Sequence, residues 1–338
     1  MIQSMRYIKF LIFLLLFIGL NSCRRNYPPM NEYQVVGFVP IDSLEVGRIF
    51  VLDSELIVLY SSQNDASVYD RMRKYNLSNP VKPELTDEIR LTETLPEPLL
   101  SQYNKFLIFS IADLNTIKIL DFYDNRVHDM NLGFRPLAIA SKDSFMFILA
   151  DSCLTGWNIA DFSNPVMIYR DSVLTGFTRG MLAINDTLLF AYLNNYSFKL
   201  WNIKLPSQPQ LISTGALGYG IPIKIIFNNR NLFIADLDPY GWWRIRYFTI
   251  NDSGKVGFID GFSPNERLND FLVDRDTIYM LMDDRLTVSD ITTFDFLLRI
   301  EVPLPTLVSR PNFVNYNNFV YILARNKGVF IYKRTEKQ

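Results

Sequence analysis

The stretch Asp186–Phe190 has the sequence DTLLF, in which a two-residue polar turn precedes a short apolar run. The same pattern recurs six more times along the chain. Its first apolar residues lie between 39 and 50 residues apart, with a mean spacing of about 44. A period of this length, built from four short strands, is typical of a β-propeller blade. The equivalent apolar positions are Leu56, Phe106, Phe145, Leu188, Leu232, Ile278 and Phe319.

A second pattern follows five of these runs by roughly 12 to 20 residues, where a strand ends in Asn or Asp followed by an apolar residue. The side chains of Asn and Asp bond to the backbone two residues ahead, and they thereby start a turn. We therefore expect these residues to begin the turn from a third strand into a fourth. They are Asn76, Asp121, Asn158, Asn202 and Asp290.

The repeats predict an all-β fold, because strand-like runs bounded by Asn, Asp, Gly and Pro occur throughout and no segment after residue 22 has a sustained helical period. Seven turns predict a seven-bladed β-propeller domain over residues 33–338. The seventh repeat ends too early for a fourth strand, whereas residues 34–39 resemble the outer strands of other repeats. We expect this N-terminal strand to close the ring. Six or eight blades remain alternatives, because the first interval is irregular.

Around Trp157–Val166 the repeat resembles the LVIVD-repeat β-propeller lipoproteins of bacteria, of a Bacteroidetes-like kind, and more loosely the WD40-like propellers. The resemblance extends as a pattern over residues 49–332. It implies a propeller fold, and it implies no activity, because such repeats carry many functions.

The N-terminus resembles a lipoprotein signal peptide. A basic start containing Arg6 and Lys9 precedes an apolar run of 11 residues, Phe10–Leu20, which is too short to span a bilayer. Leu20-Asn21-Ser22-Cys23 then resembles the site at which bacterial lipoproteins are cleaved and lipidated, palmitate included. We expect a signal peptide over residues 1–22, lipidation of Cys23 and a tether over residues 23–32. The alternative is an ordinary secretory signal that contains the cysteine.

This resemblance implies a location in the bacterial cell envelope, anchored in the membrane by lipid. Arg24 follows the cysteine where an Asp would indicate retention in the inner membrane, which favours the outer membrane. Periplasmic and surface display both stay open. Lipidation of Cys23 would leave Cys153 as the only thiol, and we expect it to be a small core residue.

Composition excludes several functional classes. The chain of 338 residues carries 34 Lys plus Arg and 35 Asp plus Glu, and this balance offers no basic patch to a nucleic acid. Its single histidine, His128, rules out any mechanism that needs two imidazoles, and two cysteines cannot form a thiolate metal cluster. We expect no metal, no cofactor and no catalytic residue, and we expect His128 to lie in a solvated turn.

Arginines recur before several of the repeated turns. In a propeller these positions lie beside the central channel, on the face that also carries the loops between second and third strands. One interpretation is a set of Arg–Asp pairs between neighbouring blades. The other is an anion or acidic-sugar site, with Arg135, Arg179 and Arg310 as the binding candidates. The full set is Arg48, Arg135, Arg179, Arg267 and Arg310.

The most distinctive loop runs from Asp236 to Arg244 and contains Tyr240, Trp242 and Trp243. Adjacent tryptophans on a strand point to opposite faces. Aromatic platforms near arginine bind sugars and form hot spots in protein interfaces, so these three residues are candidates for partner binding. The alternative is that both indoles fill space between blades. Trp157 and Trp201 occupy equivalent repeat positions and are expected in the core.

These observations favour a lipid-anchored binding or scaffold module for a protein or glycan partner over an enzyme. The alternative is a carbohydrate-active enzyme that uses carboxylates at the channel mouth, although no spacing singles out two of them. The sequence contains no phosphate loop, nucleophile elbow or zinc-protease motif.

Overall fold

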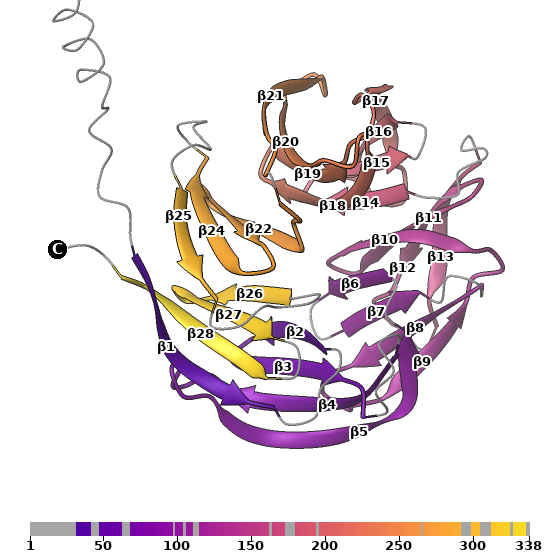
Figure 1. Ribbon diagram of the computed structural model, residues 1–338. Helices are drawn as coiled ribbons and strands as arrows, with labels where there is room; N and C mark the ends of the chain where they lie inside the picture. Colours follow the sequence, from indigo (N-terminus) through magenta and orange to yellow (C-terminus); the bar gives the residue numbers. More distant parts are fainter. Residues whose placement is uncertain are drawn as a thin grey trace, which may run out of the picture. The chain divides into compact units, whose positions relative to one another are not determined.

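Twenty-eight β-strands form seven four-stranded sheets in the part of the chain that the computed structural model describes, and no helix occurs there (Figure 1). Within that part, nothing helical is long and apolar enough to cross a bilayer. The described residues are 32–41, 47–62, 68–96, 99–103, 106–110, 115–161, 164–172, 180–193, 196–264, 266–291, 299–304, 312–324 and 327–335. Cys23, the expected signal peptide, Arg179 and Arg310 lie outside them.

Six sheets follow the chain in simple order, so each is one blade. Blade 1 contains β2 (Gly47–Leu52), β3 (Glu55–Tyr60), β4 (Val68–Asn76) and β5 (Glu84–Pro96). Blade 2 contains β6 (Leu99–Tyr103), β7 (Phe106–Ser110), β8 (Thr116–Asp121) and β9 (Val127–Asn131). Blade 3 contains β10 (Pro136–Lys142), β11 (Phe145–Ala150), β12 (Leu154–Asn158) and β13 (Val166–Asp171).

The second half of the chain repeats this order. Blade 4 contains β14 (Gly180–Ile184), β15 (Leu188–Leu193), β16 (Ser197–Asn202) and β17 (Gln210–Ala216). Blade 5 contains β18 (Ile221–Asn228), β19 (Asn231–Leu237), β20 (Trp243–Ile250) and β21 (Val256–Phe262). Blade 6 contains β22 (Asp270–Asp274), β23 (Thr277–Leu281), β24 (Arg285–Asp290) and β25 (Arg299–Pro303).

Blade 7 joins the two ends of the chain. Its strands are ordered β1 (Glu32–Pro40), β28 (Gly328–Thr335), β27 (Phe319–Ala324) and β26 (Asn312–Tyr316). The amide of Ile41 donates to the carbonyl of Lys327 at 3.3 Å, and the rings of Phe38 and Phe330 lie 4.8 Å apart. The predicted N-terminal strand closure is therefore confirmed. β1 replaces β28 as the outer edge of the sheet, so an edge remains.

Residues 34–333 form one compact unit, in which the first strand of each blade lies innermost. Contacts between first strands run from β6 through β10, β14, β18, β22 and β26 to β2. Blades 1 and 2 are joined by a buried hydrophobic cluster that includes Leu59 and Phe109. The ring is thus complete, and the prediction of seven blades is confirmed.

The repeated polar turns connect first and second strands. Second strands begin within one residue of the expected position in the six blades whose turn is described. Backbone angles at several turns are left-handed, with φ of 53° at Asp53, 50° at Asp143 and 57° at Asn229. Asn and Asp tolerate this conformation better than most residues, which explains their recurrence.

The second repeated pattern also acts as predicted. Side-chain oxygens of the residues that end the third strands accept hydrogen bonds from amides two residues ahead. The distances are 2.7 Å at Asn76, 2.8 Å at Asp121, 3.0 Å at Asn158 and 3.0 Å at Asn202. Each bond starts the turn into the fourth strand.

Hydrophobic packing between blades holds the ring together. Second strands are almost continuously buried because each blade packs against a neighbour on both faces. Trp201 is fully buried and Trp157 is 8% exposed, so both tryptophans belong to the core as expected. Cys153 is buried and unpaired, also as expected. Burial of one large apolar side chain contributes about 1.5–3 kcal/mol, and the clusters between blades repeat this gain around the ring.

Candidate functional site

Two kinds of loop gather at one end of blade 5. The connection between β19 and β20 covers residues 238–242, and the connection from blade 4 covers residues 217–220. In the β18–β19 register Ile221 lies opposite Leu237, so both loops leave the same edge of the sheet. We call this edge, with the corresponding edges of the other blades, the upper face. The turns between first and second strands lie at the opposite edge.

The 238–242 loop is fastened by hydrogen bonds to Asp238. Its side-chain oxygen Oδ1 accepts from the amides of Tyr240 at 2.9 Å and Trp242 at 2.8 Å. Its amide donates to the Trp242 carbonyl at 2.9 Å, and its carbonyl accepts from the Gly241 amide at 3.0 Å. Gly241 has a φ of 85°, which favours glycine. This closed turn presents Tyr240, 87% exposed, and Trp242, 54% exposed, to solvent.

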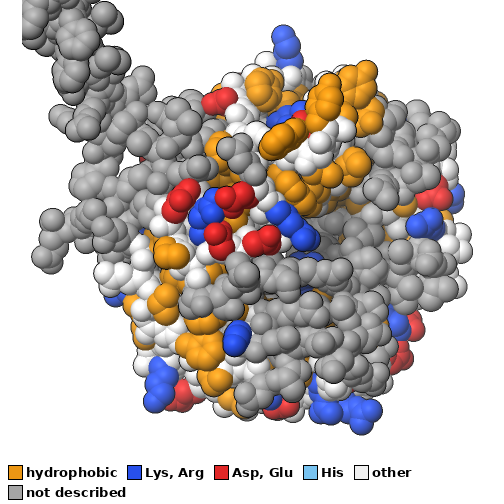
Figure 2. All heavy atoms as spheres, viewed as in Figure 1, with side chains coloured by type: hydrophobic (Ala, Val, Ile, Leu, Met, Phe, Trp, Pro, Cys, Tyr) orange, Lys and Arg blue, Asp and Glu red, His pale blue; other side chains and the backbone are white. Residues whose placement is uncertain are grey.

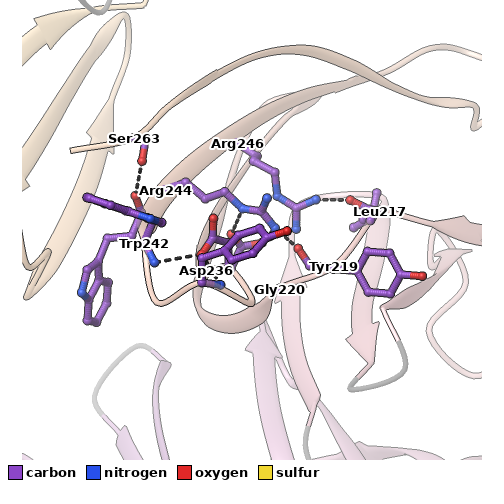
Figure 3. A network of polar contacts seen from close by, with 12 residues as sticks. Leu217, Tyr219, Gly220, Asp236, Trp242, Arg244, Arg246 and Ser263 are labelled. Atoms are coloured by element: carbon purple, nitrogen blue, oxygen red, sulfur yellow. Dashed lines mark hydrogen bonds and ion pairs between the residues drawn. The ribbon is translucent and has the colours of Figure 1, made fainter. Parts of the chain in front are cut away.

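Trp243 behaves differently from its neighbour. It is partly buried against the hydrophobic cluster between blades 5 and 6, which includes Tyr247 and Phe271. Its carbonyl accepts a hydrogen bond from the Ser263 hydroxyl at 2.8 Å (Figure 3). Only Trp243 lies on the strand β20, whereas Trp242 belongs to the loop, so strand alternation does not apply to this pair. Trp242 is exposed to solvent, and Trp243 packs between blades.

A buried ion cluster supports the loop from beneath. Asp236, at the end of β19, is fully buried and contacts two guanidinium groups of β20 (Figure 3). Arg244 Nε donates to Asp236 Oδ1 at 2.5 Å, and Arg246 Nη2 donates to Oδ2. Alternation along β20 places both arginines on one face, and Arg244 lies directly opposite Asp236 in the register.

The same arginines tie the connection from blade 4 to this cluster. Arg246 donates to the carbonyl of Leu217, and Arg244 donates to the carbonyl of Tyr219. The hydroxyl of Tyr192 in blade 4 accepts from Arg246 at 3.1 Å and donates to the carbonyl of Gly220 at 3.2 Å. Two blades and two loops are therefore joined through one carboxylate.

Gly220 is required by this geometry. A Cβ atom at this position would lie 2.6 Å from both Asp236 Oδ2 and Arg244 Nη2. Any larger side chain would displace the ion pair. Glycine therefore allows the backbone to approach the buried carboxylate closely.

The electrostatics indicate a structural role for the cluster. Burial favours the neutral form of Arg244, but the hydrogen bond and charge of Asp236 outweigh it and raise the pKa of Arg244. Burial is the main cause of the raised pKa of Tyr192. Neither group titrates near neutral pH, and both oxygens of Asp236 are occupied by arginine. The cluster is suited to holding the loops in place and not to proton transfer.

Exposed aromatic and apolar side chains adjoin the buried ion cluster. Tyr219 is 68% exposed and packs edge-on against Tyr196, with ring centroids 4.9 Å apart. Ile221 is 47% exposed at the start of β18. We define the blade 5 aromatic surface as Tyr219, Ile221, Tyr240 and Trp242. Hydrophobic side chains gather beside a hollow on the face seen in Figure 2.

The set of repeated arginines is only partly described, because Arg179 and Arg310 lie outside the described residues. Arg135 is exposed in the connection between β9 and β10, and no described carboxylate pairs with it. The ion pairs at the upper edge of blade 5 involve Arg244 and Arg246. Arg246 was not predicted from the sequence as a site residue. The missed signal was the Arg-x-Arg spacing, which puts two guanidinium groups on the face that also carries Asp236.

Among the described residues, no group of three or more His, Cys, Asp and Glu is placed so that it could hold a metal ion. His128 lies on β9 and not in a turn, so that expectation was wrong. Its strand is the paired outer strand of blade 2, because Val127–Asn131 pairs with β8. His128 lines a shallow pocket of about 260 Å³ with Trp157 and Pro165.

Comparisons with known proteins show the fold. No protein-family model matches the sequence, and no curated protein matches it. Hydrazine synthase of Kuenenia stuttgartiensis is similar in structure, with a TM-score of 0.61 at 12% identity over 88% of this chain and 98% of that one. The Cps50 (Swd1) β-propeller domain of Myceliophteria thermophila gives a TM-score of 0.63 at 10% identity, over 90% of this chain and 100% of that one.

A functionally unknown protein from Desulfotomaculum acetoxidans DSM 771 gives a TM-score of 0.57 at 10% identity, over 77% of this chain and 87% of that one. All three identities are too low to carry an activity over to this chain. The described structure and these likenesses together establish an all-β, seven-bladed β-propeller.

Proposed function

We propose that this protein is a non-enzymatic binding module that contacts a protein or glycan partner through the blade 5 aromatic surface. The observation that carries the proposal is the exposure of Tyr240, Trp242 and Tyr219. The two loops that present these side chains are supported by a buried ion cluster. Large aromatic side chains presented on a rigid support lose little entropy on binding. A propeller fold is consistent with such a role.

We further propose that the module is anchored in the outer membrane through a lipid on Cys23. Support comes from the sequence Leu20-Asn21-Ser22-Cys23 and from the apolar run before it. Substitution of Cys23 by Ala should abolish incorporation of a labelled fatty acid and release the protein from the membrane fraction. Persistent labelling of the Cys23→Ala protein would reject the anchor without affecting the proposal about blade 5.

Affinity purification from gently solubilised native membranes tests the binding proposal. The full chain should recover a partner in stoichiometric amount, and Trp242→Ala should lose it. Leu205→Ala is the matched control, because Leu205 is also a large apolar residue with 64% exposure but lies in a turn at the opposite edge of blade 4. Equal recovery by both variants would reject the aromatic surface as the contact site.

A further inference from the structure

Among the described residues, the upper end of blade 6 carries more carboxylates than cations. Arg285, at the start of β24, contacts Glu266 at 2.7 Å and Asp284 at 2.8 Å, and its Nε lies 3.6 Å from Glu301. These carboxylates are 45% to 53% exposed, so solvent and partners reach them. The hydrogen bond from Arg285 to Glu266 is the main cause of the raised pKa of Arg285. One guanidinium is shared among three carboxylates.

A fourth carboxylate extends this region. Asp283 is exposed and accepts a hydrogen bond from the neutral side chain of Asn269 at 2.7 Å. Arg267 is the other cation among the described residues of these loops. Within this described part, four carboxylates stand against two guanidinium groups, an excess of two negative charges. We call Glu266, Asp283, Asp284 and Glu301 the blade 6 acidic group.

The acidic group adjoins the blade 5 aromatic surface. The connection from β21 to β22 starts at Ser263, which bonds to the Trp243 carbonyl, and it carries Glu266 three residues later. Leu268 of the same connection is buried in the cluster against which Trp243 packs. Figure 2 shows acidic and basic side chains gathered beside hydrophobic ones on one face. Apolar and acidic surfaces therefore adjoin at the junction of blades 5 and 6.

Blade 5 offers no free guanidinium to balance this charge. Arg244 and Arg246 both donate inward, to Asp236 and to backbone carbonyls. An anionic ligand would have to displace those bonds and would also be repelled by the acidic group. The geometry here disfavours acidic sugars, nucleic acids and anionic membrane surfaces, and it favours a cationic partner.

We propose that the junction of blades 5 and 6 binds a polypeptide segment of a partner protein in which Lys or Arg alternates with large apolar residues. This inference rests on the proposed function and names its partner class. Apolar side chains of the segment would cover Tyr219 and Trp242, and its cations would lie against the acidic group. The exposed indole of Trp242 can also receive a cation on its face.

Fluorescence anisotropy with a synthetic peptide tests the proposal on the full chain in detergent. The probe is a fluorescein-labelled peptide in which lysines alternate with leucines, and its matched counterpart has glutamates in place of the lysines. The lysine peptide should bind, and the glutamate peptide should not. The affinity for the lysine peptide should fall as the salt concentration rises, because the carboxylates of the blade 6 acidic group are exposed.

Variants locate the binding surface. The double change Glu266→Gln with Asp284→Asn should weaken lysine-peptide binding about threefold to tenfold, as expected for charges at a rim. Trp242→Ala should weaken it about tenfold or more. Asp252→Asn and Leu205→Ala should leave it unchanged, because both residues are exposed at the opposite edge of their blades. Unchanged unfolding curves for all variants would show that the fold is intact.

Several results would overturn the inference. Stronger binding of the glutamate peptide, no binding of the lysine peptide, or insensitivity to the acidic double variant would each reject it. If the native partner is still lost with Trp242→Ala in those cases, the proposed function stands and only the partner class is wrong. If Trp242→Ala affects neither the peptide nor the native partner, both proposals fail.

Discussion

The backbone amide of Ile49 donates a 2.7 Å hydrogen bond to the side-chain oxygen of Asn312, which lies 263 positions later in the sequence. This bond joins the innermost strand of blade 1 to the innermost strand of blade 7. The side chain of Asn312 is only 8% exposed. Its oxygen gives the Ile49 amide a hydrogen-bond partner in a place that water does not reach. The ring is therefore closed by β1 at its outer rim and by this polar contact near its axis.

Replacing Asn312 by Ala should destabilise the protein by about 1–3 kcal/mol, because it leaves a buried amide unsatisfied. Chemical denaturation of the full chain measures the effect. Asn315→Ala is the control, since Asn315 lies on the same strand and its side-chain oxygen has no hydrogen-bond partner. Equal losses for the two variants would contradict a special role for the Ile49–Asn312 bond.

Gly328→Ala should weaken the outer closure. Gly328 has a φ of 136°, and a Cβ atom there would overlap the Val39 carbonyl oxygen of β1. We expect a loss of about 1–3 kcal/mol from backbone strain together with displacement of the N-terminal strand. Gly257→Ala is the matched control, because Gly257 has open space around it and an ordinary φ. Wild-type stability of the Gly328→Ala protein in urea would refute the closure as a source of stability.

Asp236→Asn should be among the most destabilising changes in the upper face. It removes the carboxylate that two guanidinium groups share in a buried position, and breaking such a cluster costs about 3 kcal/mol. Asp252→Asn provides the comparison, since the pair of Asp252 with Arg230 is exposed and contributes little. The measurement is denaturant unfolding. A small effect at Asp236 would show that the cluster does not support the loops.

Acid should weaken the protein partly through Asp70. Burial raises the pKa of this carboxyl, but hydrogen bonds from the hydroxyl and amide of Ser62 outweigh burial and hold the pKa below its usual value of 3.8. A folded-state pKa below the unfolded one gives stability that is complete above the unfolded pKa. That stability is lost as the pH falls through the folded pKa.

The unfolding free energy should therefore decline below about pH 4, and the decline should be smaller in Asp70→Asn. Unfolding curves recorded across this range check the expectation. Asp252→Asn should follow the wild-type profile. Parallel profiles for wild type and Asp70→Asn would mean that Asp70 does not contribute to acid sensitivity.

Much of the fold could be predicted because it depends on local chemistry that repeats. A turn such as Asp143-Ser144 needs residues that tolerate a positive φ, and Asn158 needs a side chain that can bond two residues ahead. Both requirements place Asn or Asp at regularly spaced positions in the sequence. The closing strand could be predicted as well, because a blade that lacks one strand needs it from the other end of the chain.

The candidate site was harder to predict because it combines ion pairs within blade 5 with a contact from blade 4. Sequence spacing drew attention to Arg135 at a repeated position, whereas the buried pairs of Asp236 involve arginines on the adjacent strand of the same blade. Nothing in the spacing reveals that Tyr192 of blade 4 completes this cluster. The differing exposure of Trp242 and Trp243 likewise depends on the neighbouring blade.

Site-specific photo-crosslinking in native membranes tests the binding surface most directly. Benzoylphenylalanine would replace Tyr240, which is 87% exposed on the aromatic surface, and in a separate protein it would replace Leu205. We expect a defined crosslinked partner from position 240 and none from position 205. No adduct from position 240, or the same adducts from both positions, would contradict it.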